Sequence, residues 1–113
     1  MTEKDRLEQA LQQAQNNYQA AIATLSTRKA ELSAMTQALT ALRNNPAADF
    51  KALAKMTTEH TALAEIVSAA NNAMLAAHTA MGMAQNDLDK LAEVKAQKAA
   101  QIAQAERAAR DWQ

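Results

Sequence analysis

The stretch at residues 43–49, RNNPAAD, is where the sequence predicts that the chain turns back on itself. Pro46 cannot continue a preceding helix, because it has no amide hydrogen and its ring clashes with the turn before it. Asn44 or Asn45 can take the left-handed conformation that ends a helix. Pro46 also fits the first position of a second helix with Asn45 as its N-cap. We therefore expect one domain, 1–113, with helices at 2–43 and 46–112 and a turn at 44–48.

Before this turn, apolar residues recur at alternating steps of four and three, the heptad spacing of a coiled-coil helix. This stripe, the first seam, has Arg28 as its polar member and consists of Leu7, Leu11, Ala14, Tyr18, Ala21, Leu25, Arg28, Leu32, Met35, Leu39 and Leu42. Thr2 and Asp5 have the spacing of a capping box, in which each side chain bonds the other residue's amide. These features predict a helix that starts beside Thr2.

After the turn the same spacing returns as a second seam of Leu53, Met56, His60, Leu63, Val67, Ala70, Met74, Ala77, Met81, Ala84, Leu88 and Leu91. It continues more weakly through Lys95, Lys98, Ile102, Ala105, Ala109 and Trp112. The phase does not slip at Gly82, the single glycine of the chain. We therefore expect a helix that is continuous past Gly82. The alternative is a three-helix bundle with a break at 82–86, where Asn86 would cap a third helix.

Two seamed helices joined by a short turn predict an all-α fold, a long antiparallel helical hairpin of coiled-coil type. Two registers remain open, because facing residue numbers can sum to 88 or to 95. The sum of 88 places the polar seam residues Arg28 and His60 opposite each other as a polar core layer. The sum of 95 places the charge-free segment 9–27 inside the other charge-free segment, 66–86.

These charge-free segments also bear on self-association. The outer face of a helical hairpin is usually covered by charged residues, whereas here it carries Ala, Thr, Ser, Asn and Gln. Small residues of this kind let helices approach closely. We therefore expect the middle of the hairpin to pack on more helix, and a second copy that completes a four-helix bundle is the partner we favour.

The last part of the second helix has no partner within the hairpin, because the first helix reaches only to residue 86 or 93. Val94, Ile102 and Trp112 lie in this part, and Met83 lies off the seam. These four residues are our candidate interface. They predict either a third helix that folds back or docking on another chain.

Nothing in the sequence predicts an enzyme. His60 and His78 are about 27 Å apart at helical rise, and no metal-ligand spacing, phosphate loop or nucleophile motif occurs. We therefore expect no catalytic residue, no cofactor and no metal. Two helices without a cleft would also leave a reaction exposed to water.

Composition narrows the class of protein further. The chain has 30 alanines, one glycine, one proline, 3% aromatic residues and no cysteine, which is typical of long helices. Its 12 basic and 12 acidic residues balance, so we expect binding neither to nucleic acid nor to a membrane. The first residues, MTEKDRLEQA, lack the apolar run of a signal peptide, so the sequence predicts a cytoplasmic protein.

From these features we expect a non-enzymatic protein–protein interaction module, a homodimer or higher oligomer with a further, unidentified protein partner. Scaffold, adaptor and assembly chaperone are the roles that fit, and a structural or assembly part of a phage-like or secretion-like particle is one concrete version. The alternative is a helical arm that binds nucleic acid, against which the balanced charge argues.

Overall fold

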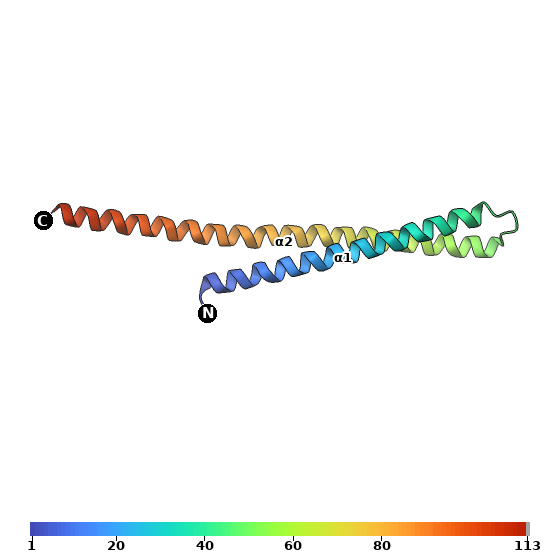
Figure 1. The fold of residues 1–113 in the computed structure, drawn as a ribbon, viewed down its shortest axis with the longest axis horizontal. Helices are drawn as coiled ribbons and strands as arrows, with labels where there is room; N and C mark the ends of the chain where they lie inside the picture. Colours follow the sequence, from blue (N-terminus) through green and yellow to red (C-terminus); the bar gives the residue numbers. More distant parts are fainter. Residues whose placement is uncertain (113) are drawn as a thin grey trace.

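The protein is a long hairpin of two helices in the computed structural model, which describes residues 1–112. Helix α1 spans Glu3–Arg43 and helix α2 spans Phe50–Asp111. They run antiparallel and pack along the whole of α1, within an envelope of 100 × 23 × 14 Å (Figure 1). The predicted fold class, an all-α helical hairpin with the longer helix second, is confirmed.

The start of α1 is fixed by the predicted capping box. The amide of Asp5 donates to Oγ1 of Thr2 at 3.1 Å, and the amide of Thr2 donates to the Asp5 carboxylate at 3.2 Å. This backbone amide, together with the Thr2 hydroxyl, holds the pKa of the Asp5 carboxyl below its ordinary value. Two of the amides that a helix leaves unbonded in its first turn are therefore satisfied locally.

The turn differs from the prediction in two ways. Neither Asn44 nor Asn45 adopts a left-handed conformation, since no residue from 1 to 112 has a positive φ. The second helix begins at Phe50, four residues after Pro46, with Asp49 as its N-cap. The side chain of Asp49 accepts from the Lys51 amide at 3.2 Å.

The reason for the later start is that Asn45 is used in the turn. Its side-chain oxygen accepts from the Ala47 amide at 3.0 Å, and its carbonyl accepts from the Ala48 amide at 3.1 Å. Pro46 is thus the second residue of a four-residue turn, a position that its fixed φ suits. Packed helix axes lie about 8–10 Å apart, so the chain needs more than two residues to cross between them.

Helix α2 continues without interruption through Gly82, as the unbroken phase of the second seam predicts. The alternative, a third helix after a break at 82–86, does not form. Figure 1 shows α2 running beyond the N-terminus of α1 as a single straight rod. Gly82 is exposed and its φ is not positive, so the position makes no demand that only glycine can meet.

The two predicted seams form the interface between the helices. All residues of the first seam are buried or half-buried, and so are all residues of the second seam up to Leu91. The most deeply buried side chains are Ala14, Leu25 and Leu39. From residue 92 to residue 112 every side chain is exposed, because α1 does not reach that far.

Contacts between the helices select the register. Oγ1 of Thr36 lies 2.9 Å from Nε2 of His60, and the rings of Tyr18 and His78 lie 5.3 Å apart. The residue numbers in each pair sum to 96, which differs by one from the register of 95 and by eight from the register of 88. The charge-free segment 9–27 therefore faces its counterpart in α2.

Gly82 provides a test of continuity. A Cβ added to Gly82 meets nothing within 4 Å, so replacement by alanine introduces no clash. Because glycine in a helix interior is less favourable than alanine, we expect Gly82→Ala to raise the free energy of unfolding by about 1 kcal/mol. Urea denaturation monitored by circular dichroism measures the change. A destabilised variant would contradict a continuous helix at this position.

Candidate interaction surface

The end of α2 beyond α1 together with its C-cap, residues 92–112, is the largest segment of the described chain without a partner in the hairpin. Three of the four predicted interface residues belong to this region: Val94 is 46% exposed, Ile102 60% and Trp112 90%. Their position outside the hairpin agrees with the expected lack of an internal partner. Exposed apolar side chains on an isolated helix favour docking on a further helix.

The middle of the hairpin forms a second candidate surface, which we call the middle flank. Ile22 and Leu75 are 41% and 52% exposed, and their numbers sum to 97, so they lie at nearly the same level of the hairpin. Heptad spacing places Ile22 at an e position and Leu75 at a b position, on the same side of the seam. Because both lie in the charge-free segments, the middle flank offers an apolar patch without charge around it.

The predicted interface residue Met83 lies apart from this patch. Met83 is 64% exposed and takes a c position, on the opposite side of the seam from Leu75. Ile66, at a g position, lies on the same side as Met83. Ile22, Ile66 and Leu75 were not among the interface residues predicted from the sequence. Their heptad positions off the seam could have identified them, because a large apolar side chain there contributes nothing to the hairpin itself.

The polar seam residues do not pair with each other. Nη1 of Arg28 lies 3.0 Å from Oε2 of Glu31, three residues on in the same helix. His60 lies opposite Thr36, which is eight residues, or about 12 Å, along α1 from Arg28. The structure therefore does not bring together the predicted polar layer of Arg28 and His60, because the register that formed moves them apart.

The hydrogen bond between Thr36 and His60 links the two helices near the turn. The Thr36 hydroxyl has one proton and two partners in reach, the Leu32 carbonyl oxygen at 2.8 Å and Nε2 of His60 at 2.9 Å. When the proton goes to Leu32, Nε2 of His60 donates to the hydroxyl oxygen, and in the other tautomer Nε2 accepts. His60 is half-buried among apolar seam residues, where this bond keeps its polar edge satisfied.

Charge contributes little to the contact between the helices. The three ion pairs within residues 1–112 join Lys4 to Glu8, Glu3 to Arg6 and Arg28 to Glu31, all inside α1 and all on exposed side chains. Exposed pairs of this kind stabilise a helix by about 0.5 kcal/mol or less. The hairpin therefore depends on apolar packing along the seams.

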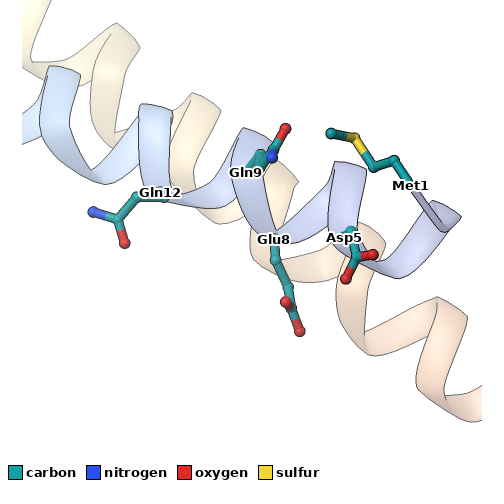
Figure 2. Close-up of a pocket in the computed structure, with 5 residues that line it drawn as sticks. All are labelled: Met1, Asp5, Glu8, Gln9 and Gln12. Carbon is teal, nitrogen blue, oxygen red and sulfur yellow. The ribbon is translucent and has the colours of Figure 1, made fainter.

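Two hollows in the surface lie near the N-terminus of α1. One is lined by Met1, Asp5, Glu8, Gln9 and Gln12, and Figure 2 shows that these side chains spread around a single helix without converging on a common point. The other, the end groove, is more enclosed and mostly apolar, and it lies between the helices where α1 begins. Its lining residues are Lys4, Leu88, Leu91, Ala92 and Lys95.

Two further observations describe the chemistry of the surface. Among residues 1–112, no three His, Cys, Asp or Glu side chains gather closely enough to hold a metal ion. No helix of the described chain has the length and apolar character needed to cross a bilayer.

No protein-family model, curated protein or solved structure matches the chain.

The register gives a prediction for Thr36 and His60. In a double-mutant cycle of Thr36→Val and His60→Leu, we expect a coupling energy of about 1 kcal/mol, the usual net contribution of one hydrogen bond. Urea denaturation of the wild type, both single variants and the double variant measures it. The control cycle pairs Arg28→Leu with His60→Leu and should show no coupling. Coupling in the control cycle alone would contradict this register.

Proposed function

We propose that the protein is a non-enzymatic interaction module, a helical hairpin that pairs with a second copy through its middle and serves as a scaffold, adaptor or assembly chaperone. The observation that carries this proposal is the middle flank, where exposed Ile22 and Leu75 lie at one level within charge-free stretches of both helices. A solvated coiled-coil surface normally carries charges at such positions.

The shape of the hairpin supports the same role. A rod 100 Å long and 14 Å thick encloses little volume, and its described residues pack only along one seam. Its interior contains no fully buried large side chain. A second hairpin laid on the middle flank would bury Ile22 and Leu75 and convert the two-helix middle into a four-helix bundle.

Self-association through the middle flank can be measured directly. Light scattering over micromolar concentrations should give a mass of at least twice the 12.2 kDa of one chain. Leu75→Glu places a charge in the apolar contact, so we expect it to weaken dimerisation at least tenfold, or by about 1.4 kcal/mol. Because Leu75 is half exposed in the single chain, the hairpin itself should remain folded.

Ala73→Glu is the matched control, since Ala73 is exposed in the same helix at a g position on the other side of the seam. It adds the same charge without touching the middle flank, and it should leave the dimer intact. A wild-type chain that stays monomeric up to hundreds of micromolar would overturn the proposal. Equal weakening by both variants would show that the contact lies elsewhere.

A further inference from the structure

The seam that holds the hairpin together continues beyond the end of α1. Lys95, Lys98, Ile102, Ala105, Ala109 and Trp112 keep the steps of three and four that the buried residues of α2 follow. They are all exposed, and only Lys95 lies beside the start of α1, in the end groove with Lys4. A helix laid on this stripe, which we call the tail seam, would extend the α1–α2 interface in a straight line.

We propose that the tail seam is covered by the tail seam of a second copy, running antiparallel, with facing residue numbers that sum to 207. The facing pairs are then Lys95 with Trp112, Lys98 with Ala109 and Ile102 with Ala105. Each pair sets a large side chain against a smaller or flatter one, as interdigitation requires. The inference rests on the proposed self-association but assigns it a second contact, separate from the middle flank.

The position of α1 fixes this register. Antiparallel seams face each other only at sums seven apart, so the neighbouring choices are 200 and 214. A sum of 200 would lay residues 107–112 of the second copy over residues 88–93, where α1 already packs on Leu88 and Leu91. A sum of 214 would pair neither Lys95 nor Lys98 with any of residues 92–112 of the second copy. Among residues 92–112, the sum of 207 gives the longest pairing that does not collide with α1.

The end groove receives Trp112 in this register. Trp112 of the second copy lies at the level of Lys95, one of the residues that line the groove beside Leu91 and Ala92. A tryptophan ring fills such a mostly apolar hollow well, and the Lys95 ammonium can lie over its face. The groove thus offers a site for the most exposed aromatic side chain of the protein, which is 90% exposed in the single chain.

Charge selects the antiparallel direction. In a parallel pair, Lys95 and Lys98 would each face the same lysine of the second copy, and the like charges would repel. In the antiparallel pair, Lys95 and Lys98 of one copy face Trp112 and Ala109 of the other, so no two seam lysines face each other. The C-terminal end of one α2 also meets the N-terminal end of the other copy's α1, so the helix dipoles align head to tail.

Disulfide trapping tests the pairing. The chain has no cysteine, so Lys98→Cys and Ala109→Cys each introduce a unique thiol. The two variants are mixed, one labelled with nitrogen-15, oxidised mildly and analysed by mass spectrometry. We expect the 98–109 heterodimer to exceed either homodimer by about tenfold, because identical positions are offset by 11 residues, or about 16 Å, too far for a disulfide.

An excess of homodimers would show parallel pairing, and a statistical mixture of the three dimers would show random collision. Either result overturns the inference. Ala100→Cys, on the outer side of the tail helix, is the control and should crosslink no faster than collision allows.

Repeating the trapping with Leu75→Glu present separates the two contacts. A heterodimer formed in that background supports the tail contact by itself. A wild-type dimer without the heterodimer overturns the tail contact and leaves self-association standing.

The fluorescence of Trp112, the only tryptophan, gives a second measurement on the chain without cysteines. We expect its emission to move to shorter wavelength as protein concentration rises, because the ring leaves water for the end groove. Ala92→Glu places a carboxylate in that groove and should abolish the shift, whereas Ala100→Glu on the outer side should preserve it. Emission independent of concentration, or a shift that survives Ala92→Glu, would overturn the inference.

Discussion

The packing of α1 on α2 along their two apolar seams is the interaction on which the rest of the structure depends. In the described chain no ion pair joins the helices, and one side-chain hydrogen bond does, between Thr36 and His60, beside the ring contact of Tyr18 with His78. Most helical stability in proteins comes from the packing of an apolar face rather than from intrinsic helix propensity. The seam therefore stabilises both helices and sets which residues remain on the surface.

The seam also divides α2 into two physically different parts. Up to Leu91 its seam residues are half-buried against α1, whereas from residue 92 the same heptad pattern continues in water. A heptad stripe with nothing on it is an incomplete coiled coil. The proposed middle contact and the proposed tail contact would each bury apolar side chains that the hairpin leaves exposed. A chain with two separate two-fold contacts can build assemblies larger than a dimer, which suits a scaffold.

Most of the fold could be predicted from local patterns. Every position that the heptad phase picks from Leu7 to Leu42 and from Leu53 to Leu91 is buried or half-buried, and the phase carried the second helix through Gly82. The start of α1 could be predicted because Thr2 and Asp5 satisfy each other within one turn. The candidate surface was predictable only in part. Val94, Ile102 and Trp112 follow from the unequal helix lengths, but the pairing of Ile22 with Leu75 requires the register.

The sequence by itself determined which residues face the partner helix, because a period of three and four depends only on the geometry of one helix. The tertiary structure alone decided which residue of α1 meets which residue of α2. Both candidate registers satisfied the heptad rule, and only the packed hairpin shows His60 against Thr36 rather than Arg28. It also decided where α2 starts, because the distance that the turn must bridge is set by the packed axes and not by the preferences of Asn45 and Pro46.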